Sequence, residues 1–184
     1  MQPSVIIIQA KHDALLGNWN VHRNHQALWT SPLIGWLKVN FDGSVQDSYW
    51  AGLGCVARDH RGDLLAAKGI KCHSRLVDMT ESRGAFAGLA VVRSFFISVT
   101  GIILEGDSTS ACDRANRILS GAYSGDTEAS FAKVIMEAPR VVISLIDREA
   151  NTVADFVAKF ACDNELDWGS GMPLSQNLFR IIST

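Results

Sequence analysis

Apolar and polar residues alternate from residue 36 onward, and this pattern predicts three strands in succession. In residues 36–42, Leu, Val and Phe alternate with Lys, Asn and Asp, as in a strand with one buried face. Further strands are expected at 52–58 and 63–71, separated by a turn at 59–62 that contains Asp and Gly. Because the connections are short, the three strands are expected to form an antiparallel meander.

After this meander the pattern changes to alternating helices and strands. Apolar residues recur at helical spacing in four segments and form short runs typical of buried strands in two others. The predicted helices span 80–96, 108–119, 127–137 and 151–162, and the predicted strands span 101–105 and 141–146. A helix between two strands requires a crossover, so the later strands are expected to run parallel to the first. The prediction is therefore an α/β fold with a mixed five-stranded sheet and helices on both faces.

The composition is typical of a globular protein with one folded domain. The 184 residues are 47% apolar and 20% charged, and 17 Lys and Arg against 19 Asp and Glu give a net charge of −2. This balance argues against tight, nonspecific nucleic-acid binding, which needs many cationic contacts with phosphates. We expect the domain at 35–163, an extension or linker at 1–34, and a loosely packed tail at 164–184.

The cysteines Cys55, Cys72, Cys112 and Cys162 each lie in an apolar segment, and no two have the spacing of a zinc-type pair. They are expected to be reduced thiols, which fits an intracellular compartment, whether nucleus or cytoplasm. The longest apolar stretch, 89–99, is interrupted by an arginine, so no membrane contact is expected. A monomer is assumed.

Four acidic residues stand at the end or on the apolar face of hydrophobic segments: Asp42, Glu81, Asp107 and Asp155. Removing an ionised carboxylate from water is costly, and four carboxylates brought together repel one another. A divalent cation removes both difficulties, and carboxylate oxygens are ligands that Mg²⁺ prefers. Asp42 and Asp107 end strands whose carboxyl ends are expected to lie side by side. If the fold gathers all four, the chain is predicted to hold Mg²⁺ and to act on phosphate.

Each carboxylate also has a structural interpretation. Asp42 precedes a glycine as in a turn, and Asp107 with the following serine could cap a helix. Glu81 in a first helical turn suits the helix dipole, and Asp155 could pair with Lys159 one turn later. A single fold that brings all four together favours the metal interpretation.

Three other polar residues border this set. Glu105 is expected to point away from the side of Asp107 or to lie at the strand edge. Ser108 is a candidate cap for the helix that follows it. Asn151 begins the last helix and is expected to cap it, with substrate contact as the alternative.

Five segments together have the order and element types of one known family. They are Gly-Trp-Leu-Lys-Val-Asn-Phe-Asp-Gly-Ser at 35–44, Val-Ala-Arg-Asp-His-Arg-Gly at 56–62, Thr-Glu at 80–81 with apolar residues at 85 and 89, Glu-Gly-Asp-Ser at 105–108, and Arg-Glu-Ala-Asn-Thr-Val-Ala-Asp at 148–155. With these segments the chain resembles the ribonuclease H type 1 family over about residues 35–163. It is most similar to the plant ribonuclease-H-like domains that are related to non-LTR retrotransposon polyproteins. The resemblance implies a ribonuclease H-like fold.

The resemblance also implies a Mg²⁺-dependent endonuclease that cuts the RNA strand of an RNA–DNA hybrid, with Mn²⁺ as a substitute ion. By position, Asp42, Glu81, Asp107 and Asp155 match the family's catalytic, metal-binding carboxylates. Asp42 would bridge two Mg²⁺ ions. Glu81 and Asp107 would hold one ion, and Asp155 the other.

Substrate contacts are expected from Gly43 and Ser44, which offer backbone amides and a hydroxyl beside the first carboxylate, and from Asn151 in the alternative to its capping role. Two features depart from the family. The connection 147–150 lacks the loop histidine of the best-studied ribonucleases H, and the segment 110–133 carries only three cations where those enzymes have a basic protrusion. The alternatives are a noncatalytic ribonuclease-H-like domain that binds nucleic acid or a partner, and a related nuclease or transposase that acts on DNA.

Overall fold

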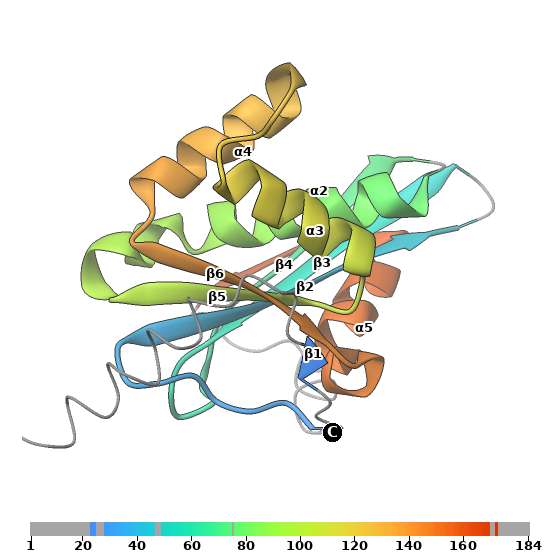
Figure 1. Ribbon diagram of the computed structural model, residues 1–184. Coiled ribbons are helices and arrows are strands. Elements are labelled where there is room, and N and C mark those ends of the chain that lie inside the picture. The colour runs from blue at the N-terminus through green and yellow to red at the C-terminus, as the bar shows by residue number, and fades with distance from the viewer. Residues whose placement is uncertain (1–22, 25–27, 47–48, 75, 170–171, 173–184) are drawn as a thin grey trace, which may run out of the picture.

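The computed structural model describes residues 23–24, 28–46, 49–74, 76–169 and 172, and its strands form one mixed sheet (Figure 1). Across the sheet the described strands have the order β1-β6-β5-β2-β3-β4-β7. In chain order they are β1 (Arg23–Asn24), β2 (Trp36–Val45), β3 (Trp50–Arg58), β4 (Leu64–His73), β5 (Gly101–Gly106), β6 (Arg140–Ile146) and β7 (Leu166–Gly169). The five central strands are those that the sequence predicts.

The pairing of the strands confirms the predicted mixed topology. β2, β3 and β4 form the antiparallel meander, whereas β5 runs parallel to β2 and β6 runs parallel to β5. β1 and β7 extend the sheet at its two edges, and the prediction of five strands omitted them. With 2 and 4 residues, they are too short to show a period-two pattern. β7 lies in the predicted tail, where four residues are ordered as a strand on β4.

Helices cover both faces of the sheet, as predicted (Figure 1). The described helices are α2 (Val77–Val91), α3 (Thr109–Leu119), α4 (Gly125–Glu137) and α5 (Thr152–Ala161), with 3₁₀ turns η1 (Arg93–Ser98) and η2 (Arg148–Ala150). α2 and α3 lie on one face, and α5 lies on the other. The predicted helix 80–96 begins earlier and ends at Val91, because the Ser, Phe and Ile residues that follow are weak helix formers and continue as η1.

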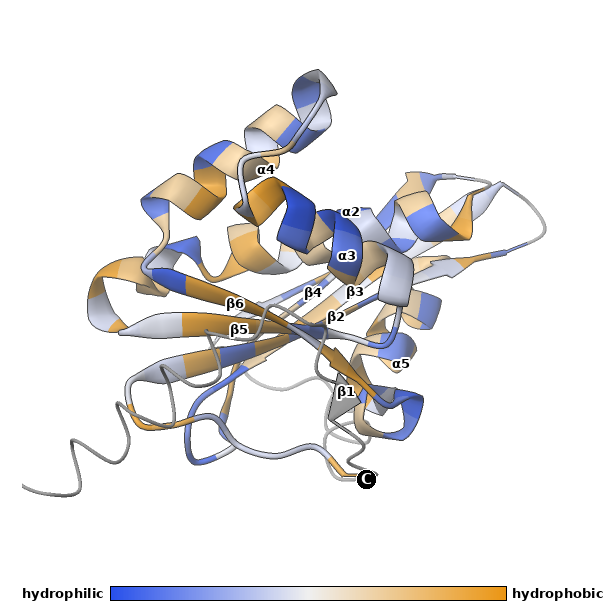
Figure 2. Cartoon of the chain, in the orientation of Figure 1, coloured by the Kyte–Doolittle hydropathy of each residue, from blue (hydrophilic) through white to orange (hydrophobic). Residues whose placement is uncertain are grey.

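The main core lies between the sheet and the pair α2 and α3. Leu37, Val39 and Phe41 of β2 point into this core and are buried there. Successive strand residues point to opposite faces, so Asn40 and Asp42 point to the α5 side of the sheet. Figure 2 shows apolar residues along β5 and β6 and hydrophilic residues on the outer side of α3. The alternation along β2 therefore places its polar side chains on the α5 side, where a smaller apolar cluster around Val157 also lies, and its apolar side chains in the main core.

The segment before β2 covers part of the α5 side of the sheet. Lys38 Nζ donates a hydrogen bond to the carbonyl oxygen of Thr30 at 2.7 Å, and the Arg58 guanidinium lies 4.5 Å from the centroid of the Trp29 ring. Residues before 35 and after 163 therefore contact the sheet. The predicted domain bounds 35–163 stay a prediction, and the contacts of residues 29–30 and 166–169 with the sheet favour a domain that extends beyond both bounds. Most of the predicted extension, 1–22 and 25–27, lies outside the described residues.

All four cysteines are described, and all are free, as predicted. Burial raises the pKa of the Cys55 and Cys112 thiols to about 12, so both stay protonated. Within the described ranges, no helix has the length and apolar character needed to cross a membrane.

Candidate active site

Asp42 is the buried centre of the predicted acidic cluster. It lies in β2 with only 7% of its surface exposed, and the backbone N–H of Gly43 donates to its carboxylate. Burial raises the pKa of Asp42 to about 7, and the nearby carboxylates of Asp107, Asp155 and Glu81 act in the same direction. The structure thus brings the four predicted carboxylates close enough to repel one another.

Glu81 reaches this cluster because the backbones of α2 and β2 touch. A Cβ on Gly43 would lie 2.5 Å from the Glu81 nitrogen, and one on Gly84 would lie 2.6 Å from the Asp42 carbonyl oxygen. Only glycine leaves room for such an approach. Burial raises the pKa of Glu81, whereas a hydrogen bond from the Ser108 hydroxyl lowers it. The N-terminal end of α2 is therefore fixed beside the end of β2.

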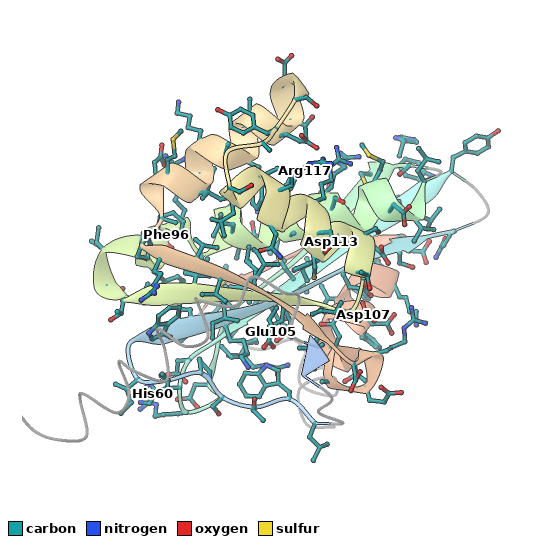
Figure 3. All side chains as sticks on the ribbon, viewed as in Figure 1. His60, Phe96, Glu105, Asp107, Asp113 and Arg117 are labelled. Carbon is teal, nitrogen blue, oxygen red and sulfur yellow. The ribbon has the colours of Figure 1, made fainter. Side chains whose placement is uncertain are left out.

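Asp107 directly follows β5 and precedes the cap of α3. The Ser108 hydroxyl accepts a hydrogen bond from the Ala111 N–H at 3.3 Å, which confirms Ser108 as the cap. The Asp107 side chain is therefore not used as a cap. Its two oxygens accept hydrogen bonds from Arg148 Nε at 3.2 Å and from Asn151 Nδ2 at 3.4 Å. In Figure 3, Asp107 lies at the end of the sheet next to α5.

Asp155 comes to the cluster on α5, which packs closely on β3. A Cβ on Gly52 or Gly54 would overlap backbone atoms of Ala158, so these glycines allow the helix to touch the strand. Asp155 accepts a hydrogen bond from Lys159 Nζ at 2.7 Å, so the predicted pair one turn apart is present. Asp155 therefore both pairs with Lys159 and lies near the Asp42 carboxylate.

Arg148 is the neighbour of the cluster for which sequence reasoning gave no role. Its side chain is 82% exposed, and its hydrogen bond to Asp107 raises its pKa above the usual range. Asp42 and Asp155 raise that pKa further. The available signal was a lone cation in the short connection just before the helix that carries Asp155.

The expectation for Glu105 is wrong. Residues two apart in a strand share a face, so Glu105 points to the same side as the Asp107 position. It lies inside the sheet, buried, where Lys38 Nζ contacts its Oε1 at 2.8 Å and Asn40 Nδ2 donates to its Oε2 at 3.3 Å. Glu105 and Asp107 are both labelled in Figure 3. The Glu105 carboxylate is thus neutralised by an ion pair with Lys38.

The donor set of the cluster fits Mg²⁺, although the side chains are not closed around a common point. Among the described residues, no three His, Cys, Asp or Glu side chains are grouped closely enough to hold a metal ion as they stand. Arg148 and Lys159 instead contact two of the carboxylates. Four carboxylates with a raised pKa at the buried centre are the environment that a hard divalent cation stabilises. The residues present therefore fit the ion.

If Arg148 competes with a cation for Asp107, removing its charge should strengthen metal binding. We expect Arg148→Gln to raise the Mn²⁺ affinity of the free protein about two- to fivefold, the scale of an exposed ion pair. Isothermal titration calorimetry measures this affinity. Arg61→Gln, in the exposed turn between β3 and β4, is the matched control and should leave it unchanged. Equal or weaker binding in Arg148→Gln would contradict the competition.

The architecture is that of the ribonuclease H-like class. The RNase H1 of Halobacterium salinarum superposes with a TM-score of 0.57 at 23% identity, covering 70% of this chain and 98% of that chain. The N-terminal RNase H domain of rv2228c from Mycobacterium tuberculosis superposes with a TM-score of 0.57 at 21% identity, covering 70% of this chain and 94% of that chain. LC11-RNase H1, solved with an RNA/DNA hybrid, superposes with a TM-score of 0.58 at 23% identity, covering 69% of this chain and 96% of that chain. At these identities the likeness shows the fold.

The sequence of the chain places it more narrowly. A profile of the reverse transcriptase-like family matches residues 40–161, which is about two thirds of the chain and includes all four carboxylates. The chain belongs to this family. No curated protein matches it.

Proposed function

We propose that the chain is a Mg²⁺-dependent endonuclease that hydrolyses the RNA strand of RNA–DNA hybrids. The observation that carries this proposal is that three carboxylates from separate parts of the chain, those of Glu81, Asp107 and Asp155, lie near the buried carboxylate of Asp42. LC11-RNase H1, a structure of similar fold, contains such a hybrid, which supports this substrate class. We also infer a relation to plant non-LTR retrotransposon polyproteins, which the reverse transcriptase-like family supports.

The roles proposed for the chain's own residues are those that the resemblance to ribonucleases H implies. Asp42 would bridge two Mg²⁺ ions, with Glu81 and Asp107 on one ion and Asp155 on the other. When bound, the ions would neutralise the phosphodiester, lower the pKa of a water and stabilise the leaving 3′ oxygen, to give 5′-phosphate and 3′-hydroxyl products. Close backbone packing of α2 on β2 and of α5 on β3 fixes the two helices that carry Glu81 and Asp155 against the sheet.

Preference for RNA would come from contacts to the 2′-hydroxyl groups beside the cluster. Gly43 and Ser44 follow Asp42 on β2 and remain our candidates for these contacts. Gly43 lies against α2, so a larger residue there would displace the helix as well as any substrate. Both substrate assignments are part of the proposal.

Cleavage of end-labelled substrates tests the function directly. With Mg²⁺, the purified chain is expected to cut the RNA strand of a hybrid and to leave duplex DNA and duplex RNA largely intact. EDTA should abolish the cleavage, because the carboxylates alone supply no cation. Cutting of duplex DNA in preference to the hybrid would instead indicate a DNA nuclease or transposase of the same fold.

Noncatalytic binding is the second candidate, and the cations of the structure favour it. Arg148 and Lys159 already pair with Asp107 and Asp155. On α3, Arg114 and Arg117 both contact Glu128, at 2.6 and 3.3 Å, which leaves them less available to phosphates and favours a partner other than nucleic acid for such a domain. A hybrid that is bound but remains uncut at stoichiometric enzyme with Mg²⁺ would support this candidate.

A further inference from the structure

Asn151 stands where a helix cap is expected but uses its side chain elsewhere. It occupies the N-cap position of α5, yet its side chain makes no cap hydrogen bond, so the predicted cap is wrong. It is only 1% exposed. Its Nδ2 donates to the carbonyl oxygen of Phe41 at 3.0 Å and to Asp107 Oδ1 at 3.4 Å. A residue type that commonly caps helices is therefore used to connect two strands.

The amide oxygen of Asn151 is held by a buried network of polar side chains. Asn151 Oδ1 accepts a hydrogen bond from Asn40 Nδ2 at 3.4 Å, and the same Asn40 nitrogen donates to Glu105 Oε2 at 3.3 Å. Glu105 is held in turn by Lys38 at 2.8 Å. Because Asn40 faces two acceptors, its amide nitrogen must point to them, which leaves Asn40 Oδ1 buried without a hydrogen-bond partner in the described part of the chain. The orientation of both amides is thus determined by this chain of contacts.

These contacts join three of the elements that carry the candidate metal ligands. Phe41 is the residue before Asp42 on β2, Asp107 directly follows β5, and Asn151 is the N-cap residue of the helix that carries Asp155. We infer that Asn151 is a positioning residue, which sets the separation of Asp42, Asp107 and Asp155 and so the affinity of the site for a divalent cation. This inference rests on the proposed function and gives Asn151 a role other than the substrate contact that the sequence suggested. Its burial and its three partners favour that role, and the predicted substrate contact stays a prediction.

Mn²⁺ affinity of the full chain, measured by isothermal titration calorimetry without substrate, tests the inference. We expect Asn151→Ala to weaken Mn²⁺ binding about tenfold, as is typical when a hydrogen-bond partner of a metal ligand is removed. Its kcat on the hybrid should fall, while its KM for the hybrid stays near the wild-type value. A substrate-contacting residue would give the reverse: a raised KM and unchanged Mn²⁺ affinity. Asn164→Ala is the matched control, because the side chain of this exposed asparagine, just after α5, donates to the Phe160 carbonyl and to no other group among the described residues.

A second variant keeps the test decisive if Asn151→Ala does not fold. Asn40→Ala removes the hydrogen bond that orients the Asn151 amide. Asn40 is buried and contacts Asn151 rather than a candidate metal ligand. It should weaken Mn²⁺ binding in the same direction by about threefold, with circular dichroism unchanged; the smaller factor reflects its indirect action. Wild-type Mn²⁺ affinity in both variants would overturn the inference while the proposed function stands. A wild-type chain that binds no Mn²⁺ would overturn both.

Discussion

Asp42→Asn is expected to lower hybrid cleavage at least about a thousandfold and to stabilise the metal-free protein at the same time. The loss follows because asparagine replaces the charged oxygen that would bridge both ions, and such contacts supply several kcal/mol to the reaction. The gain follows because the native Asp42 carboxyl is buried among three like charges and has a pKa of about 7. A neutral amide of nearly the same shape removes that repulsion and can still accept from the Gly43 N–H.

The stability gain depends on pH in a defined direction. The Asp42 pKa is about 7 in the fold against an ordinary value of 3.8, so the folded state binds the extra proton between these limits. The metal-free wild type should lose stability as the pH rises from about 4 to about 7 and then remain constant. Asp42→Asn should lack this loss, so its advantage at about pH 8 should reach about 2 to 4 kcal/mol. Urea unfolding in EDTA at several pH values measures it.

Asp63→Asn provides the control for this comparison. Asp63 is an exposed carboxylate in the turn between β3 and β4, where it pairs with Arg61. Its replacement should change stability by no more than about 0.5 kcal/mol at any pH and leave cleavage intact. If Asp42→Asn cleaves hybrid normally, Asp42 holds no ion. If its stability follows the same pH dependence as the wild type, the acidic cluster is not buried as described.

Gly54→Ala is the second change with a large expected effect, a loss of about 3 kcal/mol in the free energy of unfolding. A Cβ at this position would lie within 3 Å of backbone atoms of Ala154 and Ala158 on α5, and neither backbone can rotate away as a side chain can. The helix must therefore move off β3, which also displaces Asp155 from Asp42. Weaker Mn²⁺ binding should accompany the lost stability.

Gly169→Ala isolates the packing effect from the general effect of replacing a strand glycine. Gly169 lies in β7, and no atom of the described residues lies within 4 Å of a Cβ built there. This variant should unfold within about 0.5 kcal/mol of the wild type. Equal stability of the two variants in denaturant titrations would show that α5 and β3 are not in backbone contact.

The central sheet could be predicted because its strands carry strong local signals. β2 alternates cleanly, and the short connections to β3 and β4 leave antiparallel pairing as the simple solution. β1 and β7 gave no such signal, since a strand of 2 or 4 residues is defined by the neighbour to which it bonds. The end of α2 was misplaced for a similar reason: apolar residues after Val91 still contact the core, but in a 3₁₀ turn.

The membership of the acidic cluster could be predicted, but the partners of its members could not. The ends of parallel neighbouring strands must meet, which places Asp42 near Asp107 from topology alone. The contact of Arg148 with Asp107 depends on the path of a short turn, which residue spacing does not define. Asn151 was misread because its local position is that of a cap, whereas two tertiary acceptors compete for its amide. Long-range hydrogen bonds of this kind leave no periodic trace in the sequence.

Anomalous scattering from Mn²⁺ in crystals of the full chain tests the metal site most directly. We predict anomalous density at about 2.2 Å from the Asp42 carboxylate, with Asp107, Glu81 or Asp155 as further ligands, and no density there in Asp42→Asn. Saturating Mn²⁺ found only at other surfaces, with Asp107 still paired to Arg148, would contradict the account.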